Sequence, residues 1–379
     1  MKPIEFTVNF NSRCCLIPSI SSTFAAMKAL EDNGIIKIKK YNMSSDFADR
    51  NLYPHRYVIE LKSAEKTLAY DMSDGYQDFD FPEVFDTQLE RVDFFFKSSY
   101  DEKFASKLKN KEKFHILGMA YGCSYPGNYF EKACIKKAIT ERNYKQALSY
   151  LLKASQLQVK NDFRKLECNN HFESYNLLHW TRLWEYNHLN VEHIMKAYPM
   201  LSRKQAENKT EQQLNMLKQI NSERIKTVRL LRDAFGGRFV GGLSDNKTSR
   251  IEAPDLITDD PRVTTREGYL DSLKKNYIHI LSKGVHGCVG ARYGETFAAG
   301  RALITDPFVY EPAGNLKEGE NYLSYTSPDK VVRCAAKLIE DIDTVHRMED
   351  NNFLYYNNYV RPDVRLLNTL KIAFPESFK

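Results

Sequence analysis

The stretch YIHILSKGVHGCVGARYGETFAAGRALITD (residues 277–306) decides the predicted fold. It predicts a buried strand at residues 277–281, a glycine-rich loop at 282–293, a short helix that begins near Glu295, and a second strand at 302–305. A buried strand that leads through glycines to the N-terminus of a helix presents backbone N–H groups to a phosphate. We therefore expect this stretch to bind an anion and the rest of the chain to support it.

Two charged residues of this stretch, Arg292 and Glu295, are candidate ligand-binding side chains. The N-terminus of a helix favours an anion, and an arginine adds a bidentate partner for phosphate oxygens. A carboxylate beside a phosphate would repel it, so its natural partners are the vicinal hydroxyls of a ribose. We therefore predict that Glu295 binds ribose and that Arg292 and backbone amides bind a diphosphate. The alternative is that Glu295 stabilises the first helical turn and forms a surface ion pair with Arg292.

The loop argues against two other classes of nucleotide-binding protein. Its glycines do not form GxGxxG and no Lys-Ser pair follows them, so they favour neither a dinucleotide site nor a P-loop. His286 lies in this loop and is a candidate contact for a phosphate or a sugar. A loop histidine is more often a polar surface residue, and that interpretation stays open.

Length, charge and cysteine content limit the remaining classes. A chain of 379 residues predicts two domains. The net charge of +6, with lysines spread along the chain, fits anionic small ligands or contact with a membrane surface, and it lacks the basic block of a nucleic-acid binder. The seven cysteines show neither a CxxC pair nor metal-ligand spacing, which predicts reduced thiols in a cytoplasmic protein. We expect no signal peptide and no transmembrane helix.

The first part of the chain predicts an α/β unit with a mostly parallel sheet. The predicted strands lie within residues 4–10, 56–61, 66–76, 90–99 and 113–127, and helices are expected at 21–33 and 100–110. Ligands of parallel sheets lie beyond the carboxyl ends of the strands. We therefore expect one rim of the sheet to carry Asp71, Ser73, Asp74, Gly75, Lys97, Tyr121 and Gly122.

Asp71 and Asp74 are the candidate catalytic residues of this rim. Either carboxylate would suit a general base that deprotonates an acceptor hydroxyl, or a partner for sugar hydroxyls. Ser-Asp-Gly is also ordinary turn chemistry, so an Asx-type turn is an equal alternative. The spacing does not fit a metal-binding DxD, and we predict no metal site. If neither aspartate is the base, His115 or His55 would be next.

A helical joint and a second α/β unit follow. Residues 128–172 predict a charged helix pair, and ESYNLLHWTRLWE (173–185) predicts a strand with Thr181 and Arg182 at its exit. The long polar stretch after it predicts a helix that stops at Gly236-Gly237. Further on, the sequence predicts a strand in RFVGGLSD, a helix with a threonine N-cap within DDPRVTTREGYLDSLKKN, and several closing helices.

Several of these segments resemble one enzyme family. RYGETFAAGRALITD followed by GENYLSYTSPDKVV is similar to the donor-binding half of GT-B glycosyltransferases, in the group 1 branch that includes CgeB-like spore-coat proteins. VTTREGYLDSLKKNYIHIL and LLHWTRLWE are similar to other parts of the same half, and AYDMSDGY and VDFFFKSSY resemble strand ends of the first half. The resemblance covers residues 174–350 firmly and 55–125 more loosely.

The resemblance implies a GT-B fold with two Rossmann-like domains, a cleft between them and a C-terminal helix that crosses back. The expected boundaries are 1–172 for an acceptor domain, 173–352 for a nucleotide-sugar donor domain and 353–379 for the returning helix. It implies the following roles: Glu295 on the ribose, Arg292 and Arg182 on the diphosphate, the amides around Gly294 and Thr296 in a phosphate cradle, and Thr181 and His286 beside the donor.

One departure from the family pattern bears on mechanism. Many retaining members carry a first glutamate eight positions before the second, and this chain has Gly287 there. The sequence therefore favours a metal-independent, inverting hexosyltransferase or related transferase with Asp71 or Asp74 as base, in polysaccharide biosynthesis. A nucleotide-diphosphate sugar would be the co-substrate and no cofactor is expected. The acceptor would be a glycan, a glycolipid or a protein. The alternatives are a sugar-nucleotide epimerase of the same fold and a catalytically silent glycan- or partner-binding module.

Overall fold

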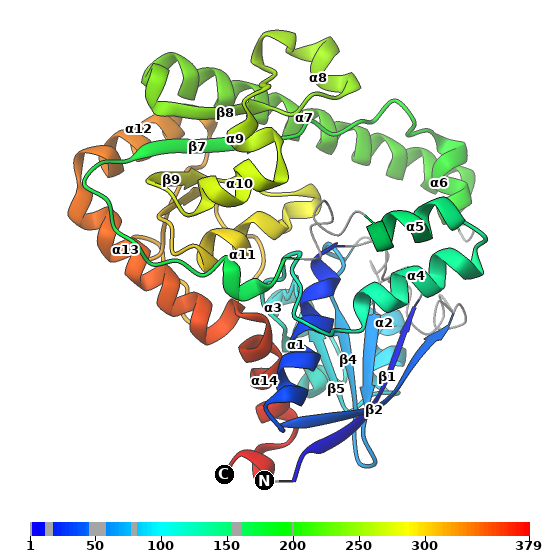
Figure 1. Ribbon diagram of the computed structural model, residues 1–379. Coiled ribbons are helices and arrows are strands. Elements are labelled where there is room, and N and C mark those ends of the chain that lie inside the picture. Colours follow the sequence, from blue (N-terminus) through cyan, green and yellow to red (C-terminus); the bar gives the residue numbers. More distant parts are fainter. Residues whose placement is uncertain (1, 12–17, 45–57, 77–81, 153–160, 199–200) are drawn as a thin grey trace.

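The computed structural model describes residues 2–11, 18–44, 58–76, 82–152, 161–198 and 201–379. Two β-sheets, each flanked by helices, form two domains that lie one above the other in Figure 1. Cys14, Cys15 and His55 lie outside the described residues. Within the described part of the chain, no helix has both the length and the apolar character that crossing a membrane requires.

The N-terminal domain contains a six-stranded sheet with the order β2-β1-β3-β4-β5-β6. Its strands are β1 (Ile4–Asn11), β2 (Ile36–Ser44), β3 (Val58–Lys62), β4 (Thr67–Asp71), β5 (Phe94–Lys97) and β6 (Phe114–Ile116). β3 pairs antiparallel with both of its neighbours, and the other pairs are parallel. The predicted mostly parallel sheet is thus present, with one reversed strand in its centre.

Five helices belong to this domain: α1 (Ser21–Asp32), α2 (Pro82–Leu89), α3 (Glu102–Ala105), α4 (Phe130–Thr140) and α5 (Tyr144–Leu152). The buried core joins Phe6 and Phe10 of β1 to Phe24 of α1. The sequence analysis assigned no element to β2 or α2. The helix expected at residues 100–110 is a single turn, because Asp101 caps α3 through the Phe104 amide and the chain turns again at Ser106.

The C-terminal domain has a fully parallel sheet with the order β11-β10-β9-β7-β8. Its strands are β7 (Asn176–Thr181), β8 (Phe239–Leu243), β9 (Tyr277–Ile280), β10 (Leu303–Thr305) and β11 (Tyr322–Ser324). The helices are α6 (Val191–Ala197), α7 (Arg203–Phe235), α8 (Lys247–Glu252), α9 (Pro261–Thr264), α10 (Arg266–Leu273), α11 (Ala291–Ala298), α12 (Pro328–Glu340) and α13 (Ile342–Tyr355).

Local signals in the sequence explain where two of these helices begin and end. A capping box between Ser202 and Gln205 opens α7, and the helix stops at Gly236, whose φ of 50° suits a glycine. The predicted threonine N-cap is Thr265, whose hydroxyl accepts a hydrogen bond from the Gly268 amide at the start of α10. The predicted helix stop at Gly236 and the predicted threonine N-cap are both confirmed.

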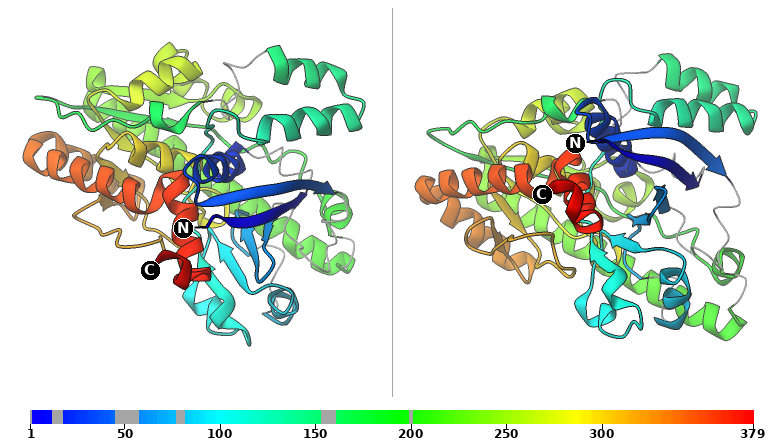
Figure 2. Two further views of the ribbon diagram at one scale, coloured as in Figure 1. Left: turned by 60° about the horizontal axis from the view of Figure 1, so that its bottom comes forward. Right: turned by 90° about the horizontal axis from the view of Figure 1, so that it is seen from below.

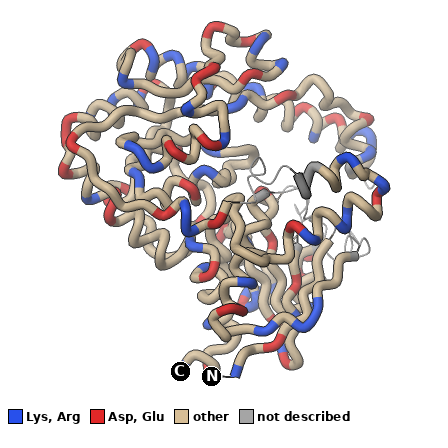
Figure 3. The backbone as a smooth tube through the Cα atoms, viewed as in Figure 1, with Lys and Arg blue, Asp and Glu red and all other residues tan. Residues whose placement is uncertain are grey.

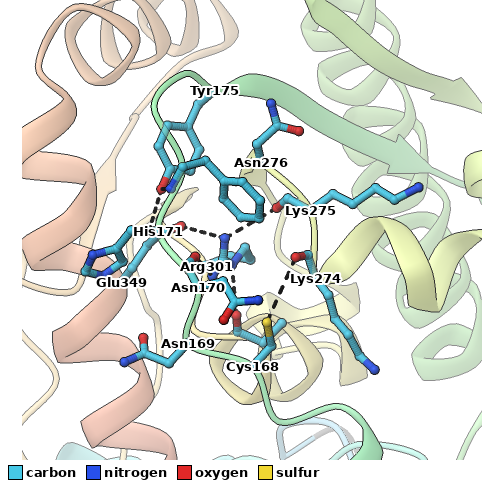
Figure 4. Close-up of polar contacts among 12 residues, drawn as sticks. Cys168, Asn169, Asn170, His171, Tyr175, Lys274, Lys275, Asn276, Arg301 and Glu349 are labelled. Atoms are coloured by element: carbon cyan, nitrogen blue, oxygen red, sulfur yellow. Dashed lines mark hydrogen bonds and ion pairs between the residues drawn. The ribbon is translucent and has the colours of Figure 1, made fainter.

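A buried arginine fixes the segment that connects the two domains. Arg301, just after α11, donates to the carbonyl oxygen of Asn170 at 2.6 Å and pairs with Glu349 of α13 at 2.9 Å (Figure 4). Glu349 also accepts a hydrogen bond from the hydroxyl of Tyr175, which lies directly before β7. Because neither Arg301 nor Glu349 has exposed side-chain surface, these contacts hold the connecting segment firmly against the C-terminal domain.

The chain then returns to the N-terminal domain. A π-helical turn (Tyr356–Val360) follows α13, and α14 (Pro362–Ala373) packs against α1. Leu366 and Leu370 enter the same core as Phe24, and both termini lie side by side at the foot of this domain (Figure 2). Two Rossmann-like domains joined by a returning helix are the predicted GT-B fold class, which is confirmed.

Candidate functional site

A pocket of about 620 Å³ opens at the carboxyl ends of β7 and β9. If the five strands are numbered 1 to 5 along the chain, their order across the sheet is 2-1-3-4-5. The strand order therefore reverses between β7 and β9. Open α/β sheets bind their ligands at this reversal. We call the cavity the switch-point pocket. Its lining comes from the end of β7 and the residues after it (179–182 and 184), Arg224 of α7, Ser244 after β8, 264–266 and Tyr269 around α10, the end of β9 and the residues after it (280–282 and 284), and 290–293 and Glu295 around α11.

The helix that faces this pocket begins earlier than the sequence predicted. α11 starts at Ala291, with Gly290 as its N-cap residue, so Arg292 lies in the first turn and Glu295 in the second. The expectation that Glu295 occupies the first turn was therefore wrong. The two side chains still share one helix face, because they are three residues apart. The first backbone amides of a helix have no partner within the helix, and Gly290 and Ala291 at this helix start line the pocket.

Glu295 is 3% exposed and already has two partners. Its Oε1 atom lies 3.0 Å from Nη1 of Arg266, and its Oε2 atom accepts a hydrogen bond from the Tyr269 hydroxyl at 3.1 Å. Both partners belong to α10, so this carboxylate joins α10 to α11. The surface ion pair with Arg292, offered as an alternative, is not the arrangement found, since the ion pair of Glu295 is with Arg266.

Aromatic rings hold the two arginines that the sequence analysis placed on a diphosphate. The guanidinium of Arg292 lies 4.5 Å from the ring centre of Trp180 and 5.6 Å from that of Tyr269. The guanidinium of Arg182 lies 5.1 Å from the ring centre of Trp184. Stacking fixes the plane of each guanidinium while its N–H groups stay available for a ligand.

The pocket holds an excess of positive charge. Its lining contains four arginines (Arg182, Arg224, Arg266 and Arg292) and one glutamate, a difference of three charges (4 − 1). Figure 3 shows acidic and basic residues mixed over both domains, so this local excess is not a general feature of the molecule. A ligand that carries several negative charges would be complementary to it.

Several buried donors in this lining lack partners within the described part of the chain. They are the indole Nε1 atoms of Trp180 and Trp184, Nε of Arg224, and Nε and Nη2 of Arg266. Indole and guanidinium nitrogens only donate hydrogen bonds. A buried donor without an acceptor is costly, so this arrangement fits a ligand rich in acceptor oxygens.

His179, on β7, contributes differently to the same pocket. It hydrogen-bonds through Nδ1 to the carbonyl oxygen of Ile280 at 2.6 Å, which ties β7 to β9. Burial, together with the charges of Arg292 and Arg224, lowers the pKa of His179 to about 4. The imidazole is therefore neutral at physiological pH and adds no charge to the pocket. Thr181, the last residue of β7, accepts a hydrogen bond from the Ser244 amide through its carbonyl oxygen.

A second, smaller cavity of about 240 Å³ lies between the two domains. The N-terminal domain lines it with residues that follow β4, β5 and β6, and the C-terminal domain lines it with residues 289–291 and 308, 310–312. We call it the cleft pocket. It shares Gly290 and Ala291 with the switch-point pocket, so the two cavities meet at the N-terminus of α11.

The two candidate bases have different surroundings. Asp74 is exposed and lines the cleft pocket. Although the residue as a whole is exposed, protein atoms largely enclose its carboxyl group, and this burial raises the pKa of Asp74, while Cys288 and Lys97 act in the opposite direction. Asp71 has no exposed surface and pairs with Lys97, which is equally buried. Lys97 thus ends β5 at the predicted rim, but its side chain is buried in the ion pair, and of the two carboxylates Asp74 is the one that lines the cleft pocket.

The remaining predicted residues are placed as follows. The amides of Gly294 and Thr296 lie inside α11, beyond its first turn, and the Thr296 hydroxyl bonds to Nδ1 of His279. His286 adopts a φ of 57° beside Gly75 and lines a separate hollow next to Arg182 and Trp184. His115 of β6 stacks on neighbouring phenylalanines.

Backbone geometry accounts for Gly287, at the position where many retaining members of the family that the sequence resembles carry a glutamate. Gly287 has a φ of 75°, a conformation that side-chain-bearing residues rarely adopt. A Cβ atom there would lie 2.7 Å from a methyl carbon of Val309. A glutamate at this position would be strained in the loop as it is built. In the described residues, no group of three His, Cys, Asp or Glu side chains is arranged to hold a metal ion.

The sequence analysis missed Arg224, Arg266, Tyr269 and Trp180 as pocket residues. Arg266 and Tyr269 follow Thr265, the predicted N-cap of α10. Their position in the first turns of a helix that leads into β9 could have marked them as pocket residues. Arg224 is one of many charged residues in a helix of 33 residues, and the sequence offers no signal that singles it out.

The fold and the two pockets define a two-domain α/β protein of GT-B architecture. The chain matches no protein-family model and no curated protein. Among solved structures it is similar to S. aureus MnaA in a structure with UDP (13% identity, 99% of this chain and 97% of that chain covered, TM-score 0.44). It is also similar to HepE from Anabaena in complex with UDP-glucose (11%, 98% and 100%, TM-score 0.37) and to a glycosyltransferase from Rickettsia africae (11%, 100% and 100%, TM-score 0.33). At these TM-scores the fold assignment rests on the strand order of this chain.

Proposed function

We propose that the protein transfers a sugar from a nucleotide-diphosphate sugar to an acceptor hydroxyl, without a metal ion and with inversion at the anomeric carbon. The observation that carries this proposal is the meeting of the two pockets at Gly290 and Ala291. A donor whose diphosphate lies at the N-terminus of α11 would place its nucleoside in the switch-point pocket and its sugar in the cleft pocket, beside Asp74.

The residues of the switch-point pocket would bind the leaving group. The backbone amides at the start of α11, together with Arg292 and Arg182, would stabilise the negative charge that develops on the diphosphate. Glu295 would accept hydrogen bonds from the ribose hydroxyls, in addition to those from Arg266 and Tyr269. The excess positive charge of the lining supports this assignment.

Asp74 would act as the general base. The acceptor oxygen would form a bond to the anomeric carbon while the bond from that carbon to the diphosphate oxygen breaks. The proton of the acceptor would move to Asp74, and the nucleoside diphosphate would leave with the electron pair. The ionised carboxylate is required for this step, and such a base contributes about 10²–10⁴-fold to the rate. The acceptor that we propose is a glycan, a lipid-linked acceptor or a protein.

Turnover of a sugar-nucleotide panel tests the proposal. Release of a nucleoside diphosphate from one donor is expected, faster with an acceptor than without, and unchanged by EDTA. Asp74→Asn should slow release by about 100-fold or more while donor binding persists. Conversion of the sugar nucleotide to an isomer without an acceptor would instead indicate the epimerase. Binding without any turnover would indicate the silent module, and absence of both would contradict the nucleotide-sugar proposal.

A further inference from the structure

Arg224 connects the two loops that form the mouth of the switch-point pocket. It lies on α7, and its guanidinium donates from Nη1 to the carbonyl oxygen of Arg182 at 2.5 Å. The Nη2 atom donates to the carbonyl oxygen of Lys283 at 3.1 Å. Arg182 follows β7 directly and Lys283 follows β9, so one side chain joins the exits of the two strands between which the strand order reverses.

The third nitrogen of this guanidinium is left without a partner. Nε of Arg224 is buried and makes no hydrogen bond to any described residue, although the side chain lines the pocket. The residue is only 8% exposed, so bulk water does not replace the missing acceptor. A planar guanidinium with two bonds to fixed carbonyls cannot turn to satisfy its third N–H group. A ligand in the pocket would supply this acceptor.

The electrostatic surroundings indicate the chemistry of that ligand. Burial, together with the charge of nearby Arg292, lowers the pKa of Arg224 to about 10. Arg224 thus remains charged at neutral pH beside a second cation. A neutral acceptor would satisfy the Nε–H group but would leave this repulsion in place. An anion bound between the two guanidinium groups would remove both costs.

We infer that Arg224 is a ligand-binding and positioning residue, whose Nε–H group donates to an oxygen of a diphosphate while its Nη atoms hold the two loops around that group. The inference rests on the proposed nucleotide-diphosphate site and adds to it a contact from α7, outside the glycine-rich loop and α11.

Inorganic pyrophosphate is the probe, because it carries the diphosphate without a base or a sugar. Isothermal titration would compare wild-type protein with Arg224→Gln and Arg224→Lys. Arg232→Gln is the matched control, since Arg232 lies on the same helix and pairs on the surface with Asp255. We expect both Arg224 variants to bind at least tenfold more weakly, and the control to bind within twofold of wild type. Lysine should not rescue binding, because an ammonium group cannot hold two carbonyls and a phosphate in one plane.

Two results would overturn the inference: a folded Arg224 variant that binds within twofold of wild type, and wild-type protein that does not bind pyrophosphate. If both variants fail to fold, a crystal structure of wild-type protein with pyrophosphate decides. A phosphate oxygen within hydrogen-bond distance of Arg224 Nε is expected, and pyrophosphate bound away from this atom would overturn the inference.

Sugar-nucleotide turnover, measured in parallel, separates this inference from the proposed function. If Arg224→Gln turns over the sugar nucleotide with an unchanged KM, the proposed role of Arg224 is wrong and the proposed transferase activity stands. If pyrophosphate binding depends on Arg224 but the protein turns over no sugar nucleotide, the anion site stands and the proposed transferase activity is wrong.

Discussion

The Asp71 Oδ2 atom lies 3.0 Å from the Lys97 Nζ atom, and neither side chain has exposed surface. The two residues end neighbouring parallel strands and face each other in the register of β4 and β5. Ser73 donates both its amide and its hydroxyl to the other oxygen of Asp71. This buried ion pair therefore shapes the loop that carries Asp74 into the cleft.

Removing the carboxylate charge of Asp71 should destabilise the fold. In Asp71→Asn, Lys97 would stay buried without a counter-charge, and we expect the free energy of unfolding to fall by about 3–5 kcal/mol. Asp74→Asn is the matched control, because Asp74 lies in the same loop but is exposed, and its unfolding free energy should stay within about 1 kcal/mol of wild type. Urea denaturation measures both. Equal stabilities of the two variants would show that the buried pair does not hold this loop.

The rate of transfer should depend on pH through Asp74. Burial raises the pKa of this carboxyl above its ordinary value, and the base is active only when ionised. We therefore expect kcat/KM to fall as the pH falls through the raised pKa, above the value of about 3.9 of a free aspartate. Because the shift is upward, the contribution of Asp74 to stability is present below the unfolded-state pKa and is lost as the pH rises through the folded-state pKa.

A pH–rate profile of the wild-type protein measures this acid limb. Residual activity of Asp74→Asn, followed over the same range, is the control and should lack the limb. A wild-type limb at or below the pKa of a free aspartate would argue against Asp74 as the base.

Gly294 should not tolerate a side chain. A Cβ atom there would lie 2.6 Å from Cδ1 of Tyr121, a fully buried residue of the N-terminal domain. Gly294→Ala should therefore lower the free energy of unfolding by about 1–3 kcal/mol, because overpacking forces both domains to shift at their contact. Gly237→Ala is the control, since no atom lies within 4 Å of the added carbon. If Gly294→Ala is as stable as this control, α11 does not pack against Tyr121 as described.

Glu295→Ala should weaken binding of nucleoside diphosphates more than tenfold if the carboxylate binds ribose. The variant should also lose the preference of the wild-type protein for ribonucleotides over 2′-deoxyribonucleotides. Titration of both forms with both ligand types measures this difference. If Glu295 serves only to hold Arg266, the variant will discriminate against the deoxy sugar as the wild-type protein does, and the ribose role will be wrong.

Strong local patterns made much of the fold predictable. The alternation in β1, the buried run of β9 and the glycine stop of α7 each reflect interactions within a few residues. β2 was missed although Ile36 and Ile38 alternate with lysines in the pattern of a strand; the alternation breaks at Lys40, where the register with β1 shifts. The start of α11 was placed four residues late because glycines near a helix start conceal its first turn.

The sequence predicted only those site residues that lie at strand ends and helix starts. Thr181, Arg182, Arg292 and Glu295 line one pocket because strand exits and helix starts meet at the sheet edge. Which of Asp71 and Asp74 forms the buried ion pair depends on Lys97, a residue on another strand, and sequence spacing cannot decide it. The same holds for Arg224, since only the packing of α7 against the sheet selects the face that reaches the pocket.

The central claim is that a nucleotide-diphosphate sugar binds in the switch-point pocket and reaches the cleft pocket past Gly290. A crystal structure with the nucleoside diphosphate of the preferred donor tests it most directly. The expected result is a diphosphate at the N-terminus of α11 within reach of Arg292, with the nucleoside directed toward Glu295 and Tyr269. A nucleotide that binds in solution but occupies a site elsewhere, with the switch-point pocket empty, would contradict the claim.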